Sequence, residues 1–210
     1  RNIDYKWNAA YGQQLKTSSG KIYKGTILEH LLVQNLVQFY NVGVHNHVRL
    51  EGADWNDGLD MAKEHGESVA FSSMYAQNLL ILSQLLLKVG VLDLEVAQEL
   101  KVLLVDFNYS DIAQKHRILK QYFSKTNESL SGKKIRLTAL SLSDSLKKKS
   151  LWMKQHIQKS EWLKAGFFNG YYDNRKQRVD GKKGSLVQMT LASQVFPIMG
   201  QVANAAQIKK

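Results

Sequence analysis

The sequence predicts an all-α fold in which helical hairpins are joined by long loops. Apolar residues recur at intervals of three and four along most of the chain, which is the spacing of one helix face. Few runs alternate between polar and apolar residues as half-buried strands do. Helix, loop and helix follow one another without a fixed-period repeat, and this pattern suits a toroid of inner helices ringed by outer ones. With 210 residues, 44% of them hydrophobic, we expect residues 1–210 to form a single domain with a substantial core.

Two long helices are predicted in the first half of the chain. Apolar residues at helical spacing predict a helix over residues 26–41, with Thr26 as its N-cap. A second helix is predicted over residues 67–88 and should stop at Gly90. It is apolar nearly all round, so we expect it to pack against neighbours on both sides.

The middle of the chain predicts a further helical pair and a loop. Residues 93–104 and 110–125 have helical patterns, and Ser110 or Asp111 is a suitable cap for the second. Residues 124–136 are polar and contain Ser129, Ser131 and Gly132, so we expect a loop there.

The last third of the chain predicts helices on either side of an irregular segment. Residues 140–163 support one or two helices. Residues 166–184 are rich in Gly, Asn, Asp and basic side chains, which favours an extended loop or a hairpin. A last helix is predicted over residues 186–203, where Pro197 must lie near the start or produce a kink.

Composition narrows the classes of protein to consider. The net charge is +11, but the basic residues are scattered and are not interleaved with aromatic residues, which favours a solvated surface over a nucleic-acid site. The absence of Cys excludes disulfides and thiolate metal sites, and fits a cytoplasmic protein. No uninterrupted apolar run approaches the ~20 residues that span a bilayer, so we expect no membrane partner. Because the chain starts at Arg1 without a signal region, we expect a fragment or an excised domain.

The densest group of chemically useful side chains follows the first helix, at Asp54, Trp55, Asn56 and Asp57. Ionised groups are costly to bury without partners, so this cluster is poor core material. It is well suited to holding a sugar, because the indole offers a flat face and the polar groups can bind hydroxyls. Crowded carboxylates also raise the pKa of one of their number, as a general acid requires.

The segment Leu50-Glu51-Gly52-Ala53-Asp54-Trp55-Asn56-Asp57-Gly58, followed by His65-Gly66-Glu67-Ser68-Val69, resembles the catalytic stretch of glycoside hydrolase family 94. Members of this family are inverting disaccharide phosphorylases, such as those that act on cellobiose and chitobiose. The resemblance implies a catalytic domain that is an (α/α)-barrel of six helical hairpins, of which this chain would form roughly half, the C-terminal part. It also implies cleavage of a β-linked gluco-disaccharide by phosphate to give an α-sugar 1-phosphate.

The resemblance assigns roles to individual residues. Asp57 corresponds to the general acid, and Trp55 corresponds to a contact of the transferred sugar. Asp54 and Asn56 would orient the loop or bind hydroxyls, although both could equally cap a turn or the following helix. Two further residues, Glu67 and Ser68, match a family segment at the start of the next helix. For these two we favour a structural role, through the helix macrodipole for Glu67 and through capping for Ser68.

A second block of resemblance covers residues 167–174 and 189–197, where Tyr171 and Gln194 could border the acceptor sugar. A turn and a packed helix explain these segments as well. The chain also departs from the family. Some members place an Arg four residues after the acid to bind phosphate, and Met61 stands at that position here. The remaining phosphate-binding elements of the family would lie beyond Lys210.

Two alternative functions fit parts of the sequence. A glycoside hydrolase on the same barrel would need a second carboxylate as the base for water, and the acidic residues close to Asp57 in sequence make no obvious opposite-face base. A non-catalytic, basic helical binding protein would leave the Trp55 cluster unexplained. His45 and His47 suggest a metal site, but no carboxylate lies beside them at ligand spacing. We therefore expect a carbohydrate substrate, inorganic phosphate as co-substrate, and no cofactor, metal or nucleic acid. We expect the parent enzyme to be a homodimer and the isolated fragment to be inactive.

Overall fold

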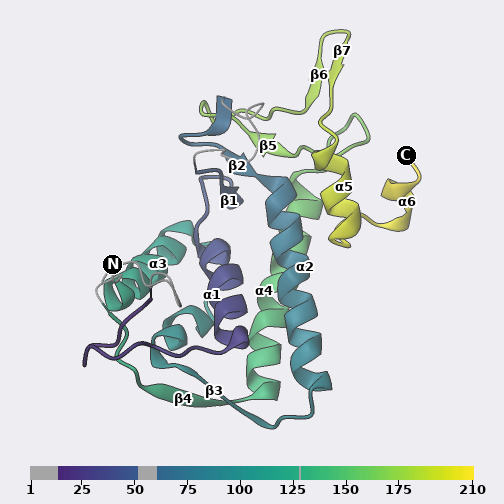
Figure 1. Ribbon diagram of the computed structural model, residues 1–210. Helices are drawn as coiled ribbons and strands as arrows, with labels where there is room; N and C mark the ends of the chain where they lie inside the picture. The colour runs from purple at the N-terminus through teal and green to yellow at the C-terminus, as the bar shows by residue number, and fades with distance from the viewer. Residues whose placement is uncertain (1–13, 52–60, 128) are drawn as a thin grey trace.

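The computed structural model describes residues 14–51, 61–127 and 129–210 of the chain, and two long antiparallel helices run through its centre (Figure 1). These helices are α2, Val69–Lys88, and α4, Ala139–Ser160. Two serine side chains of α4 bond to backbone carbonyls of α2. Ser143 Oγ donates to the carbonyl of Ser83 at 2.8 Å, and Ser150 Oγ donates to the carbonyl of Ala76 at 2.6 Å. These hydroxyl groups are buried, and the carbonyls of the facing helix satisfy them.

Three shorter elements complete the main core. They are α1, Ile27–Tyr40, the 3₁₀ helix η2, Gln98–Leu104, and α3, Ile112–Thr126. In Figure 1, α1 lies between α3 and the pair of long helices. The buried apolar side chains of this core come from all five helices and include Leu32, Leu36, Phe39, Leu79, Leu100, Leu103, Ile118, Leu142 and Leu146. Removal of this apolar surface from water is the main stabilising contribution to the fold.

The starts of α1, α2 and α3 follow the capping rules on which their prediction rested, whereas α4 is capped by Thr138 and not by Ser143 or Asp144, the caps that its sequence suggests. Thr26 caps α1 in a capping box with Glu29. Ser68 caps α2 by accepting a hydrogen bond from Phe71 N at 2.9 Å, as predicted. Asp111, the second of the two candidates, caps α3. The helices predicted over 26–41, 67–88, 110–125 and 140–163 are therefore confirmed, with α4 a single helix.

The all-α prediction, and with it the expectation of part of an (α/α)-barrel, is wrong. Of the described residues 49% are helical and 17% are in strands, in three small antiparallel sheets, so the fold is mixed. Residues 93–97, predicted as helix, form β3, Asp93–Ala97, which pairs with β4, Lys134–Thr138. β4 alternates polar and apolar residues throughout and β3 does so over its first four residues, which is the strand period. The register places Val96 opposite Ile135.

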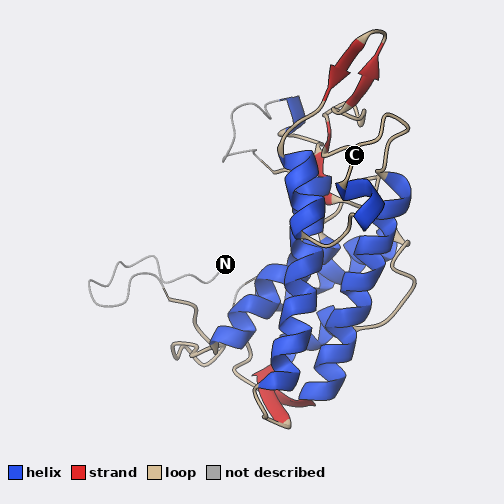
Figure 2. Cartoon of the chain, turned by 90° about the vertical axis from the view of Figure 1, so that its right-hand side faces the viewer, coloured by secondary structure: helices blue, strands red, loops and turns tan. Residues whose placement is uncertain are grey.

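The other strands are two or three residues long. β1, Val48–Arg49, β2, Glu67–Ser68, and β5, Tyr171–Tyr172, form one sheet in the order β1-β2-β5. A hairpin of β6, Gly181–Lys183, and β7, Leu186–Gln188, projects beyond the helices, while β3 and β4 lie at the opposite end (Figure 2). Strands this short give no recognisable periodicity in the sequence, and tertiary pairing therefore decides them.

The C-terminal helix is shorter than predicted. The first part of the segment 186–203 forms β7, and α5, Ala192–Met199, begins only after it. Pro197 lies near the end of α5 and not near its start. A final short helix, α6, spans Ala205–Ile208.

Helix α2 is less enclosed than its composition predicted. It packs against α4, α1 and α5, but Ile81, Leu85 and Leu87 are exposed. By length and composition it is the one helix of the described residues that could cross a membrane, and half of its apolar window is buried inside the fold. Tyr75 and Phe71 of the same helix are partly buried against the core.

Two lysines are buried inside the aromatic part of the core. Lys115 Nζ lies 4.1 Å from the ring centre of Phe39 and 4.3 Å from that of Trp152, and donates to Asn46 Oδ1 at 2.8 Å. Lys149 Nζ donates to the carbonyl of Val105 at 3.2 Å. Burial lowers the pKa of Lys149 to about 8 and that of Lys115 well below its usual range.

We expect the free energy of unfolding to rise as the pH increases from about 8 to about 9.5. In this window the folded chain has lost the proton of Lys149 while the unfolded chain still binds it, and each such group contributes up to about 1.4 kcal/mol per pH unit. Urea denaturation at several pH values measures the slope. Lys149→Met should reduce it, and Lys147→Met, on the exposed face of the same helix, should not. An unchanged slope in Lys149→Met would contradict the assignment of this pH dependence to Lys149.

Candidate functional site

The small sheet β1-β2-β5 lies at the end of the helix pair where α2 begins and α4 ends (Figure 1). It also fixes the described residues on either side of the segment 52–60. Leu50 N donates to the carbonyl of Gly66 at 2.9 Å, and the carbonyl of Met61 accepts from Asn174 N at 2.7 Å. The predicted site residues Asp54, Trp55, Asn56 and Asp57 belong to that segment and lie outside the described residues.

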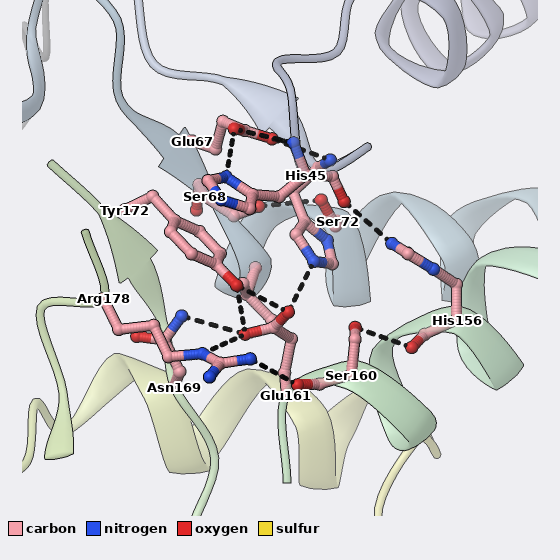
Figure 3. Close-up of polar contacts among 12 residues, drawn as sticks. His45, Glu67, Ser68, Ser72, His156, Ser160, Glu161, Asn169, Tyr172 and Arg178 are labelled. Carbon is pink, nitrogen blue, oxygen red and sulfur yellow. Dashed lines mark hydrogen bonds and ion pairs between the residues drawn. The ribbon is translucent and has the colours of Figure 1, made fainter. Parts of the chain in front are cut away.

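A buried carboxylate, Glu161, is at the centre of the polar network beside this sheet (Figure 3). It caps the C-terminus of α4, and its side chain is 1% exposed. Each of its oxygens accepts hydrogen bonds from side chains of distant segments: His47 Nε2 at 3.1 Å, Asn169 Nδ2 at 3.0 Å, Tyr172 OH at 2.9 Å and Arg178 Nε at 3.4 Å. We refer to these five residues as the Glu161 network.

The charge of Glu161 is strongly stabilised. Burial by itself would raise its pKa, but the hydrogen bond and charge of His47, together with hydrogen bonds from Asn169 and Tyr172, lower the pKa to about 2. Glu161 is therefore ionised throughout the physiological range. Burial, and then the charge of the same carboxylate, raise the pKa of Tyr172, which keeps the phenol protonated and able to donate.

His47 is almost completely buried, and its two ring nitrogens have different environments. Nε2 donates to Glu161, whereas Nδ1 has no hydrogen-bond partner among the described residues. Nε2 carries a proton in this arrangement, because the Glu161 carboxylate can only accept. A second buried imidazole, His156, lies 4.9 Å away between ring centres and donates to the carbonyl of His45. Burial, and then the proximity of His47, lower the pKa of His156.

Glu67 is the second buried carboxylate of this region, with no exposed surface. It accepts from the backbone N–H groups of His45 and His47 and from His45 Nδ1 at 2.8 Å. A side chain at Gly43 would meet the Glu67 carboxyl at 2.3 Å, so the close approach requires glycine there. The structural role predicted for Glu67 is present, but the carboxylate binds the loop before β1, because Glu67 lies in β2 before the start of α2.

The two predicted acceptor-site residues of the second block have packing and hydrogen-bonding partners in the structure. Gln194 spans the backbone of Phe168, accepting from its N–H at 3.1 Å and donating to its carbonyl at 2.9 Å. Tyr171 is 2% exposed and packs with Leu50 and Val179, and burial raises its pKa to about 12. Both residues therefore shape the backbone around the sheet.

A third buried acid of this region, Asp180, links the backbone just before β5 to the backbone just after β7. It accepts from Gly170 N at 2.7 Å and from Thr190 N at 2.5 Å. Burial raises its pKa despite these hydrogen bonds. Gly170 lies so close to Ser193 that an added side chain would meet Ser193 Cβ at 2.4 Å. The turn thus brings the residues around Asp180 and Gln194 against the sheet.

The histidines do not form a metal centre in the part of the chain that the structure describes, where no group of three His, Asp or Glu side chains has suitable positions. His45 is held by Glu67 and stacks on Tyr172 at 3.7 Å, and His47 is held by Glu161. Their spacing in the sequence reflects two neighbouring hydrogen-bonded positions in one loop.

Sequence reasoning did not identify Glu161 or Asp180 as important residues. A signal for Glu161 was present, since it is an acidic residue at the end of a helix followed by the apolar pair Trp162 and Leu163. The four partners of its carboxylate are spread from His47 to Arg178, and no local pattern could connect them.

Comparison with known proteins gives no independent assignment. No known family model matches the chain, and no curated protein matches it.

We expect Glu161→Gln to lower the free energy of unfolding at neutral pH by about 3 kcal/mol. The amide would point N–H groups at donors and would leave His47 and Arg178 without a charged partner. Chemical denaturation measures the loss, with Glu64→Gln at an exposed position as control. The difference from the wild type should shrink as the pH falls from about 4.5 towards 2, because protonation then removes the same charge. A difference independent of pH would contradict this account.

Proposed function

We propose that the chain provides the catalytic acid of an inverting glycoside phosphorylase that cleaves a β-linked gluco-disaccharide or oligosaccharide with phosphate. The observation that supports this proposal is the run Asp54-Trp55-Asn56-Asp57 at its spacing before Gly66-Glu67-Ser68-Val69. These are the side chains that sugar stacking, hydroxyl binding and proton donation require, arranged as in glycoside hydrolase family 94.

In this reaction the enzyme supplies the proton donor and phosphate supplies the nucleophile. Asp57 donates a proton to the glycosidic oxygen as the bond from that oxygen to the anomeric carbon breaks. A phosphate oxygen attacks the same carbon from the opposite face, so the β-linkage becomes an α-sugar 1-phosphate. Because phosphate brings its own negative charge, no second protein carboxylate is needed as a base. Trp55 would hold the transferred sugar by stacking on its apolar face.

The described residues around the segment support this proposal indirectly. Residues 50 and 61, which flank it, are hydrogen-bonded to neighbours of a sheet whose buried acids have several fixed partners. Reaction sites need such support, because catalytic groups must be held within a fraction of an ångström of their productive positions. We assign the Glu161 network and Glu67 to this supporting role.

We expect release of free sugar to depend on the phosphate concentration, with α-sugar 1-phosphate formed in equal amount. The assay uses cellobiose or chitobiose with the natural full-length protein, and with the 210-residue chain in parallel. Chromatography of the sugar and phosphorus NMR of the sugar phosphate follow the two products. Sugar release that is independent of phosphate would identify a hydrolase instead, and no release from any β-linked disaccharide would remove the support for the proposal.

Asp57→Asn in the same protein should lower turnover by ~10²–10⁴-fold, because the amide keeps the shape of the side chain and cannot donate the proton. The melting temperature should change little. Asp93→Asn, at an exposed position in β3, is the matched control and should keep wild-type turnover. If Asp57→Asn keeps more than about a tenth of the activity, another residue is the acid.

A further inference from the structure

The β6-β7 hairpin extends away from the helices in both views of the molecule (Figure 1 and Figure 2). Its strands pair in register with Lys183 opposite Leu186, so Gly184 and Ser185 form a two-residue turn at the tip. Gly184 has a φ of 62°, which a tight hairpin turn of this kind requires at its first position. All of residues 182–189 are exposed, so the hairpin is open to its surroundings on both faces.

Apolar side chains on and just after this hairpin are unusually exposed. Leu186 is 74% exposed and Val187 is 58% exposed, and both lie in β7. Met189 and Leu191 follow the strand and are 55% and 79% exposed. Apolar surface is costly to leave in water, and when it gathers in one projecting segment it marks a surface for contact with a protein or a membrane.

The same part of the chain is strongly basic. Residues 174–210 contain seven Lys and Arg residues and a single acid, Asp180. Asp180 is only 3% exposed and accepts from backbone N–H groups, so it does not offset this charge at the surface. Lys182 and Lys183 of β6 are exposed, and neither takes part in an ion pair of the described residues. A partner that fits this segment therefore has negative charge as well as apolar groups.

Basic and apolar side chains are mixed on both faces of the hairpin. Directly opposite residues of antiparallel strands point to the same face, so one face has Lys182 beside Val187 and the other has Lys183 beside Leu186. A hairpin that packs on another protein collects its apolar side chains on one face and its polar side chains on the other. The mixture found here suits a medium that surrounds the tip, because lysine stems can lie along apolar material while their ammonium groups stay among polar ones.

Nucleic acid fits the charge of this segment but not its apolar side chains. Residues 173–195 contain no Phe, Tyr or Trp, so they offer no platform on which bases could stack. Exposed aliphatic side chains also find no partner along a phosphate backbone. The surface of an anionic bilayer supplies both requirements, since charged headgroups lie directly above apolar acyl chains.

We propose that the tip of the β6-β7 hairpin inserts into the surface of an anionic phospholipid membrane. Leu186 and Val187 enter the boundary between headgroups and acyl chains, and Lys182 and Lys183 bind the anionic headgroups. A two-stranded hairpin has unpaired backbone groups along its edges, so it stops in the hydrated interface and does not cross the bilayer. The expectation of no membrane partner rested on the absence of a spanning run, which contact of this kind does not need. The proposal is independent of the phosphorylase reaction.

The test measures co-sedimentation of the 210-residue chain with vesicles of phosphatidylcholine, and with vesicles of an equimolar mixture of phosphatidylcholine and phosphatidylserine. The mixed vesicles should bind at least about tenfold more tightly, because each Lys near an anionic surface strengthens binding roughly fivefold. Leu186→Ser/Val187→Ser should weaken this binding at least about tenfold without any change of charge. Leu140→Ser, which alters a side chain 70% exposed at the start of α4, is the matched control and should bind as the wild type does.

A second pair of variants separates the hairpin from the general positive charge of the chain. Lys182→Gln/Lys183→Gln should weaken binding to the mixed vesicles at least about tenfold. Lys120→Gln/Lys147→Gln removes the same charge from exposed positions on α3 and α4 and should have a much smaller effect. Equal losses in the two variants would show binding by net charge alone and would overturn the proposal.

A label at the tip measures insertion directly and does not depend on those variants. The chain has no Cys, so Ser185→Cys accepts a single environment-sensitive dye. Its emission should shift to the blue with the mixed vesicles, and the same dye attached through Ser110→Cys, at an exposed position before α3, should not shift. An unshifted dye at the tip would overturn the proposal, as would the same shift with a single-stranded oligonucleotide or with higher protein concentration in the absence of lipid. Asp57→Asn should bind vesicles as the wild type does, so the two proposals fail separately.

Discussion

The need to satisfy buried carboxylates determines how one end of this molecule is assembled. An ionised group taken out of water is tolerated only where several hydrogen bonds replace its hydration. Glu161 receives them from side chains that lie before β1, in the loop before β5, in β5 itself, and beyond β5. Glu67 receives them from the backbone of the loop before β1. A strand pairing of only two residues would be marginal by itself. Glu161 connects the sheet β1-β2-β5 to the end of α4, and Glu67 holds the loop before β1 against β2.

The buried lysines of the main core are stabilised in a different way. Lys115 and Lys149 have carbonyl, amide and hydroxyl partners and aromatic rings, and no described carboxylate lies within ion-pair distance. Burial without a counter-charge lowers their pKa, whereas the network of donors around Glu161 lowers the pKa of that acid and favours its charge. The charged form of a lysine is therefore disfavoured in the aromatic core, whereas the charged form of Glu161 is favoured beside the sheet. The fold thus places its ionised acid beside the sheet β1-β2-β5, and its buried lysines in the aromatic core.

The sequence by itself determined the long helices and the caps of α1, α2 and α3, because helical periodicity and capping are local. Thr26, Ser68 and Asp111 each act within three residues, and their side chains cap as their types predict. The sequence also singled out Asp54 to Asp57 by residue type alone, and the described residues give no geometry for them. Only the tertiary structure decided the strands and the buried network. β3 and β4 pair across about forty residues, and Glu161 meets His47 across a separation of 114 residues. Short alternating segments and single acidic residues carry no local sign of such partners, so hydrogen bonding in the folded chain determines their roles.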